Sequence, residues 1–205
     1  MNKNGQHSKL QGMLKKIVIV GPESTGKSTL CRQLAEHYQT TWCPEFAREY
    51  LLKHGMNYTF DDLLTIAKGQ LALEDQFAAE VRSQKSEEKK QFHPHSPLTT
   101  RHSLLFIDTD MYVMKVWCEF VFDNCHRFIL DQIVERKYDL YLLCNVDLQW
   151  VKDELREYPD LENRQRLYFI YKDIMVNQSV PWVDISGGYE ERLLKAITAV
   201  DAILP

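Results

Sequence analysis

The sequence predicts an α/β fold, in which helices cover both faces of a five-stranded parallel sheet. Two observations predict it. Short apolar runs have the composition of strands that are buried on both faces, and stretches with helical periodicity separate each run from the next. In addition, a glycine-rich loop joins the first run directly to the first helix. The length of 205 residues suits a single domain.

The first strand and the loop after it carry the most specific signal. Residues 15–20 (KKIVIV) predict a buried strand, and residues 21–28 (GPESTGKS) match the phosphate-binding pattern G-x-x-x-x-G-K-[ST]. Apolar residues at 30, 34 and 38 then predict a helix. Glycines let backbone N–H groups turn around a polyphosphate, and the helix N-terminus adds positive partial charge. We therefore expect ATP phosphates to contact Gly21, Glu23, Ser24, Thr25, Gly26, Lys27, Ser28 and Thr29.

The next elements follow from local periodicity and turn residues. Residues 1–14 are polar and predict a flexible tail before the domain of residues 15–205. A second strand is expected at 40–43, a helix at 45–54, and a long helix from a capping box at Thr59 and Asp62 to about residue 82. Residues 83–102 hold charges, two prolines and almost no aliphatic residue, and they predict a polar loop insertion.

The second half of the chain continues the alternation. The predicted elements are a strand at 104–107, a helix after residue 110, a shorter helix at 128–134, a strand at 140–144, a charged helical hairpin at 150–175, a strand at 181–185 and a last helix at 190–204. Small-molecule kinases close such a charged hairpin over ATP as a lid. The expected fold is therefore a P-loop NTPase- or kinase-like domain with a helical lid.

Acidic residues follow two of the predicted strands. Asp108 ends a buried strand, where P-loop proteins place the acid that helps to hold Mg²⁺, and the Ser28 hydroxyl is the expected second ligand. Glu45 and Arg48 follow the second strand at the same sheet edge, where a carboxylate can accept the proton of an attacking hydroxyl or bind a sugar. Asp110 is a candidate for substrate contact, and capping of the next helix explains it equally well.

Basic and aromatic residues complete the candidate set. In the lid region, Arg156 and Arg164 are expected to place positive charge on the transferring phosphoryl group. Five aromatic residues follow strands two and three: Trp42, Phe46, Tyr50, Tyr112 and Trp117. Most of them are expected in the core, and one or two are candidates to stack on a flat, cationic base. Gln70 falls on the apolar face of the long helix and needs a polar partner, either backbone or substrate.

Composition excludes several classes of protein. The formal net charge of −4 argues against a general nucleic-acid binder. The sequence contains no run of 18 apolar residues, so no membrane-spanning helix is expected. The five cysteines show no C-x-x-C spacing, and they read as reduced thiols in a cytoplasmic protein. His93 and His95 flank Pro94 in the polar insertion, where solvated side chains are favoured over a metal site. The sequence leaves the oligomeric state open.

Five stretches in this order resemble the ribosylnicotinamide kinase domain of NadR-type NAD-salvage proteins: GPESTGKSTL, PEFAREYL, GQLALED, LLFIDTD, and WVKDELR with ENRQR. The resemblance covers about residues 15–205. It implies ATP-dependent phosphorylation of the 5′-hydroxyl of nicotinamide riboside to nicotinamide mononucleotide. It also implies that Lys27, Ser28 and Asp108 hold ATP and Mg²⁺, that Glu45, Arg48 and Asp110 lie near the riboside, and that Arg156 and Arg164 belong to the lid.

The chain departs from the family pattern in two respects. The H-x-G-H signature of the adenylyltransferase domain and the helix-turn-helix repressor are absent, so a stand-alone kinase is expected. Pro44 stands where the family pattern has an aromatic residue, which leaves Trp42 or Tyr50 to contact the base. Two alternatives stay open: a kinase of another nucleoside or small metabolite, and a regulatory nucleotide-switch ATPase. The guanine signature N-K-x-D of GTPase switches is missing, since Asn145 and Asp147 match it only superficially.

Overall fold

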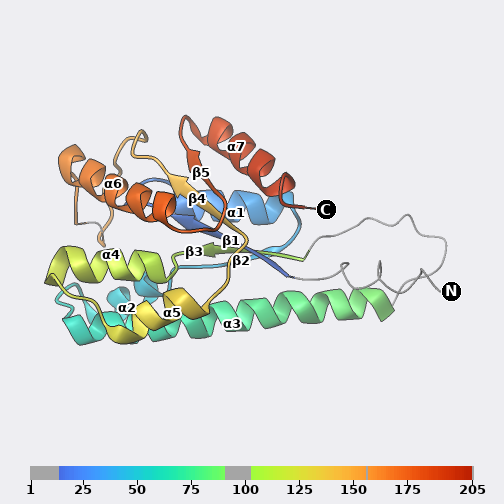
Figure 1. The fold of residues 1–205 in the computed structure, drawn as a ribbon, viewed down its shortest axis with the longest axis horizontal. Helices are drawn as coiled ribbons and strands as arrows, with labels where there is room; N and C mark the ends of the chain where they lie inside the picture. Colours follow the sequence, from blue (N-terminus) through green and yellow to red (C-terminus); the bar gives the residue numbers. More distant parts are fainter. Residues whose placement is uncertain (1–13, 91–102, 156, 205) are drawn as a thin grey trace.

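The computed structural model describes the backbone of residues 14–90, 103–155 and 157–204, and the side chains of these residues except 85–90. Its sheet consists of five parallel strands in the order β2-β3-β1-β4-β5 (Figure 1). The strands are β1 Lys15–Val20, β2 Thr41–Cys43, β3 Leu104–Asp108, β4 Leu140–Cys144 and β5 Trp182–Ile185. The predicted fold class is therefore confirmed.

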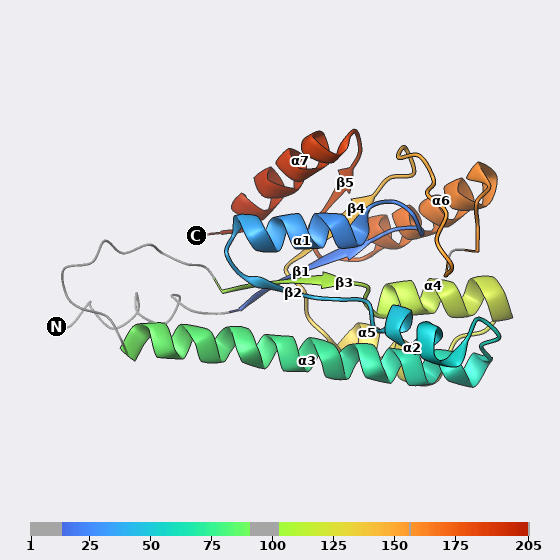
Figure 2. The same ribbon diagram turned by 180° about the vertical axis from the view of Figure 1, so that it is seen from behind.

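Helices cover both faces of the sheet because successive side chains of β1 point to opposite sides. Ile17 and Ile19 pack under α1 (Lys27–His37) and α7 (Tyr189–Asp201). Val18 and Val20 pack against α3 (Phe60–Lys90), α4 (Met111–Phe122) and α6 (Leu161–Asn177). Two more helices, α2 (Phe46–His54) and α5 (Arg127–Glu135), pack on α3 and α4, with α2 in front and α5 behind in Figure 2.

The sheet topology brings the chemistry to one edge. The register pairs Ile19 of β1 with Asp108 of β3, so the carboxyl end of β3 lies beside the start of the glycine-rich loop. The connection after β1 leads to β2 on one side, whereas the connection after β3 returns past β1 to β4 on the other side. Ligands of open α/β sheets bind at such a switch point, outside the carboxyl ends of the strands.

Two sequence predictions about helices were wrong. Residues 83–90, predicted as the start of a polar loop, continue α3 to Lys90. This stretch contains Gln, Lys and Glu, which favour helix, and the first proline after it is Pro94. Residues 91–102, with His93 and His95, lie outside the described residues, as do residues 1–13 of the predicted tail at 1–14; Leu14 packs against the core.

The lid region, predicted as a helical hairpin at 150–175, also differs from the prediction. Only residues 161–177 form a helix there, and the described residues from 150 to 160 form loops and turns. Pro159 disfavours a helical conformation at Tyr158, and the Asp160 carboxylate then caps α6 by accepting from the Asn163 N–H at 2.8 Å. The lid is therefore a loop followed by one helix.

The cysteines and the helices fit the composition-based predictions. All five cysteines are free thiols, and Cys31, Cys43, Cys118 and Cys144 are buried. Among the described residues, the apolar stretches within helices are too short or too charged to span a bilayer.

Candidate active site

The glycine-rich loop between β1 and α1 has the geometry of an anion-binding site. Gly21 has a φ of +135°, and a Cβ atom there would lie 2.7 Å from the carbonyl oxygen of Cys144, so the close approach to β4 requires glycine. Gly26 occupies the N-cap position of α1 with a φ of 81° and provides no side-chain cap. The first N–H groups of α1 are therefore left to bind an anion.

Arg192 of α7 supports this loop from behind. Its guanidinium is 3% exposed and donates to the carbonyl oxygens of Thr25 at 2.8 Å, Asn145 at 2.9 Å and Gly187 at 2.8 Å. It also pairs with the Asp147 carboxylate. Sequence reasoning missed Arg192. The available signal was its place on the apolar face of the last helix, four residues before the buried Ala196.

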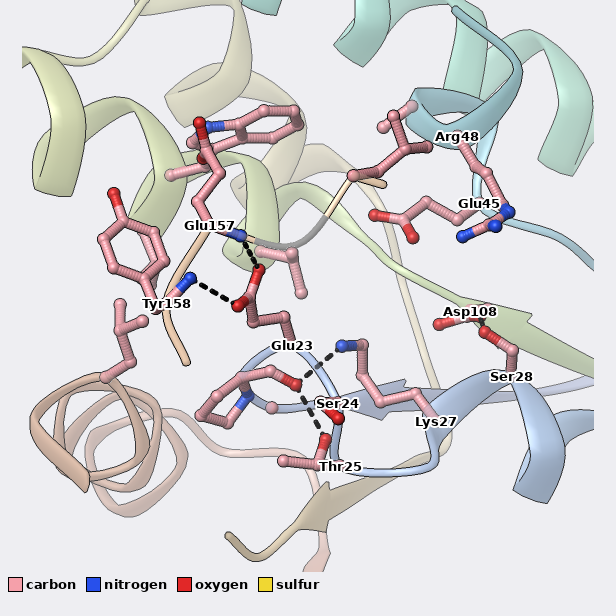
Figure 3. A pocket seen from close by; sticks show the side chains of 18 of the residues that line it. Glu23, Ser24, Thr25, Lys27, Ser28, Glu45, Arg48, Asp108, Glu157 and Tyr158 are labelled. Carbon is pink, nitrogen blue, oxygen red and sulfur yellow. Dashed lines mark hydrogen bonds between the residues drawn. The ribbon is translucent and has the colours of Figure 1, made fainter. Parts of the chain in front are cut away.

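Lys27, Ser28 and Asp108 meet where the loop adjoins β3 (Figure 3). The Lys27 ammonium donates to the Pro22 carbonyl oxygen at 2.9 Å, and the Ser28 hydroxyl donates to Oδ2 of Asp108. Asp108 is fully buried, and its Oδ1 has no hydrogen-bond partner among the described residues. Burial raises the pKa of Asp108, while Lys27 and Ser28 act in the opposite direction.

The unpartnered Oδ1 of Asp108 indicates whether these residues suit a magnesium ion. A buried carboxylate oxygen without a partner is costly unless a cation compensates it. A hydroxyl and a carboxylate are also the hard oxygen donors that Mg²⁺ prefers. Ser28 and Asp108 therefore fit Mg²⁺.

The backbone after Asp108 is strained. Thr109 has a φ of 81°, in the left-handed region that β-branched residues avoid, and it is 1% exposed. Strain of this kind costs about 1–3 kcal/mol and persists where the surroundings impose it. Here the turn lets Asp108 face the glycine-rich loop while Asp110 caps α4.

Glu45 and Arg48 reach the same space from the start of α2. Glu45 is the N-cap residue of α2, but its carboxylate makes no capping bond and points toward the space in front of Lys27 and Asp108 (Figure 3). Burial and the charge of Asp108 raise the pKa of Glu45, while Lys27 and Arg48 lower it. Arg48 is bound to Asp153 of the lid loop at 3.0 Å. The Glu45 carboxylate therefore shares the space in front of Lys27 and Asp108 (Figure 3).

The lid loop is bound to the glycine-rich loop by Glu23. Its carboxylate accepts the backbone N–H groups of Glu157 at 2.9 Å and Tyr158 at 2.6 Å (Figure 3). The Ser24 hydroxyl accepts the N–H of Val151 at 3.0 Å. The sequence pattern predicted that Glu23 and Ser24 contact phosphate. In the structure their side chains bind the backbone of the lid loop, and both residues line the cavity.

The lid loop also supports the far wall of the cavity. The Glu157 carboxylate accepts from the Tyr58 hydroxyl at 2.9 Å, and this hydroxyl accepts the indole N–H of Trp117 at 2.9 Å. The cavity has a volume of about 440 Å³. Its lining includes the glycine-rich loop, Glu45, Asp108, Trp117, Glu157 and Tyr158. Sequence reasoning missed Glu157 and Tyr158, because only tertiary contacts bring them to the site.

A family model described as an AAA domain matches residues 16–192, most of the chain and all of the site just described. The chain belongs to this AAA domain family.

Two comparisons relate this AAA domain to NadR proteins. It is 25% identical over 193 residues to the trifunctional NAD biosynthesis/regulator protein NadR of Salmonella typhimurium, and the match covers 92% of this chain and 42% of that protein. A crystal structure of NadR in complex with NR superposes with a TM-score of 0.68 at 22% identity, over 93% of this chain and 49% of that one. The chain thus spans less than half the length of these NadR proteins.

The fold also occurs in kinases of nucleotides. The structure of thymidylate kinase from Ehrlichia chaffeensis superposes with a TM-score of 0.57 at 14% identity, over 91% of this chain and 98% of that one. This likeness shows a kinase-like P-loop fold for the AAA domain.

The AAA domain brings most of the predicted site residues together. The loop residues 21–29, Trp42, Glu45, Arg48 and Asp108 all line the cavity. Arg164 is 3% exposed and donates to the carbonyl oxygens of Ser24 at 3.4 Å and Leu148 at 3.2 Å, so it lies behind the loop. Arg156 lies outside the described residues.

Tyr50 and Asp110 are placed elsewhere. The Tyr50 hydroxyl bonds to Asp62 at 2.5 Å, and its ring stacks on His54 at 4.3 Å. Asp110 is 1% exposed, caps α4 through the N–H groups of Tyr112 and Val113, and accepts from the Tyr141 hydroxyl at 2.8 Å. Among the described residues, neither side chain belongs to the cavity lining. Each is occupied by a structural contact.

The Asp110→Asn variant tests the structural role of Asp110 through pH. Burial raises the pKa of Asp110 to about 6, above the value near 4 of an unfolded chain. The folded state therefore holds this proton more tightly, and ionisation of Asp110 lowers the free energy of unfolding as pH rises from about 4 to 6. Asparagine keeps the cap and removes this loss. The free energy of unfolding, measured with urea, should therefore be higher in the variant relative to wild type at pH 7.5 than at pH 4.5.

An equal difference between variant and wild type at both pH values would contradict this role. A raised KM for the phosphoryl acceptor, with an unchanged free energy of unfolding, would instead support the substrate contact that the sequence pattern predicted for Asp110.

Proposed function

We propose that this chain is an ATP-dependent kinase that transfers a phosphoryl group to the 5′-hydroxyl of nicotinamide riboside. One observation carries the proposal: a single cavity of about 440 Å³ joins the glycine-rich loop to a chamber with an acidic and aromatic lining. A phosphoryl donor held at the loop and a nucleoside-sized acceptor would meet inside it. Such positioning supplies much of the catalysis in phosphoryl transfer.

The donor side would be organised by the glycine-rich loop and α1. In the proposal, backbone N–H groups of the loop bind the phosphates, and the Lys27 ammonium exchanges the Pro22 carbonyl oxygen, 2.9 Å away, for a phosphate oxygen. Ser28 and Asp108 would hold Mg²⁺, which supplies neutralisation of phosphate charge. Arg164 would hold the loop's outer side through the carbonyl of Ser24.

The acceptor side would use Glu45 and the aromatic wall. Glu45 faces the loop across the cavity and would take the proton of the attacking hydroxyl, while Arg48 keeps the lid loop in place through Asp153. Trp42, Trp117 and Tyr158 line the cavity. The flat, cationic pyridinium ring of nicotinamide riboside would bind well to aromatic faces and nearby carboxylates, and Glu157 provides such a carboxylate. The NadR protein bound to NR in its crystal structure supports this choice of acceptor.

An acceptor panel tests the function. The purified chain is incubated with Mg·ATP and either nicotinamide riboside, adenosine, deoxyadenosine, thymidine or no acceptor, and ADP and phosphorylated products are measured by chromatography. We expect nicotinamide mononucleotide and ADP in equal amounts, and little ADP without acceptor. ADP formation that is independent of every acceptor would favour the nucleotide switch. Phosphorylation of another nucleoside alone would keep the kinase and refute the substrate.

A further inference from the structure

Gln70 of α3 lies behind the acidic side of the site, outside the cavity. It is 1% exposed, and its amide links the ends of two strands. Its Oε1 accepts the N–H of Phe46 at 2.7 Å, and its Nε2 donates to the carbonyl oxygens of Pro44 at 3.2 Å and Asp108 at 3.4 Å. One side chain therefore bonds the backbone on both sides of Glu45 and the backbone of Asp108.

The residue before it provides a second, independent observation. Gly69 lies in the interior of a 31-residue helix, where glycine disfavours helix relative to alanine. A Cβ atom at Gly69 would lie 2.2 Å from the Phe46 ring. The missing side chain therefore lets α2 approach α3 closely, and this approach brings the Phe46 N–H within reach of Gln70.

We propose that Gly69 and Gln70 are positioning residues that hold Glu45 at a set place relative to Asp108; the inference rests on the proposed kinase function. Glu45 follows β2 and Asp108 ends β3, and these two strands pair over only three residues of β2. Loops after so short an edge strand are weakly constrained by the sheet itself. The Gln70 amide supplies the missing constraint, because buried amide bonds to three backbone groups fix both loops to one rigid helix.

The Gln70→Met variant tests the positioning role. Methionine keeps the length and volume of the side chain and loses its hydrogen bonds. We expect kcat to fall about 10- to 100-fold with KM for Mg·ATP changed less than about two-fold, because a misplaced base affects the transfer step and not nucleotide binding. An unchanged kcat in folded protein would overturn the inference, and so would a loss confined to KM.

Two further variants separate positioning from stability. Gly69→Ala forces α2 away from α3, so we expect the same loss in kcat. The double variant, Gly69→Ala with Gln70→Met, should lose less kcat than the product of the two single fold-losses, because both changes remove the same constraint. Ala72→Gly lies on the exposed side of the same helix and lowers Tm through helix propensity alone. It should retain kcat. If both Gln70→Met and Ala72→Gly lose kcat only in proportion to their unfolded fraction, the positioning role is refuted.

Amide hydrogen exchange separates this inference from the proposed function. The Phe46 N–H, which Gln70 accepts, should exchange at least about ten-fold faster in Gln70→Met, with exchange in β1 and α1 unchanged. This measurement needs no substrate. If wild type phosphorylates no acceptor, the proposed function fails, yet faster exchange at Phe46 still supports the positioning role of Gln70. Unchanged exchange at Phe46 in Gln70→Met overturns the positioning role even if the enzyme is active.

Discussion

The Lys27→Met variant is expected to transfer phosphate at least ~100-fold more slowly than wild type, a loss of ~2–3 kcal/mol of transition-state stabilisation. The Lys27 ammonium lies at the mouth of the glycine-rich loop, already aimed at an oxygen acceptor 2.9 Å away. Methionine keeps the bulk of the side chain and removes the positive charge that stabilises the transferring phosphoryl group in the proposed mechanism. Initial rates at saturating Mg·ATP and acceptor measure the effect.

The matched control is Lys53→Met, which removes the same charge from the exposed end of α2. It should retain the wild-type rate. Equal rates for Lys27→Met and wild type would refute phosphoryl transfer at this loop. An equal loss in both variants would indicate a general effect of charge.

The Glu45→Gln variant is expected to lose about 10²–10⁴-fold in kcat, the range for a positioned general base. Glutamine keeps the shape of the side chain but cannot accept the proton of the acceptor hydroxyl. Glu49→Gln is the matched control, since Glu49 is exposed on the same helix and four residues further along. Single-turnover rates distinguish slow transfer from slow product release. A loss shared with Glu49→Gln would contradict the assignment.

The pH dependence of kcat checks the same assignment. Burial and the neighbouring Asp108 charge raise the pKa of Glu45 to about 6, against the opposing effect of Lys27 and Arg48. A base works only when ionised, so the wild-type rate should fall as pH decreases through this region. The residual rate of Glu45→Gln should lack that acidic limb. A limb that persists unchanged in the variant would assign the titration to another group.

The strands and the glycine-rich loop could be predicted closely because their signals are local. The run KKIVIV matches β1 over residues 15–20, and the predicted strand at 140–144 matches β4. Buried parallel strands are apolar throughout, and the loop pattern places glycine at Gly21 and Gly26, where the backbone has a positive φ. Asp108 could be placed at the sheet edge for the same reason, since it ends a buried strand.

Helix boundaries and side-chain partners could not be predicted in the same way. Propensity extends α3 to Lys90, although polarity had predicted a loop from Ser83. Tyr50 and Asp110 had suitable positions for substrate contact, but Asp62 and the N-terminus of α4 bind them instead. Competition between possible partners is decided by distance, which the linear pattern does not contain.

The sequence alone determined the α/β class, the order of its strands along the chain, and the presence of a phosphate-binding loop. Each of these depends on contacts between residues close in the chain. Only the tertiary structure decided that Arg192 supports this loop, that Glu23 binds the lid loop, and that Gln70 joins the strand ends bearing Glu45 and Asp108. These bonds connect residues up to 167 positions apart. Such pairs meet only after the sheet order and the packing of helices on each face are established.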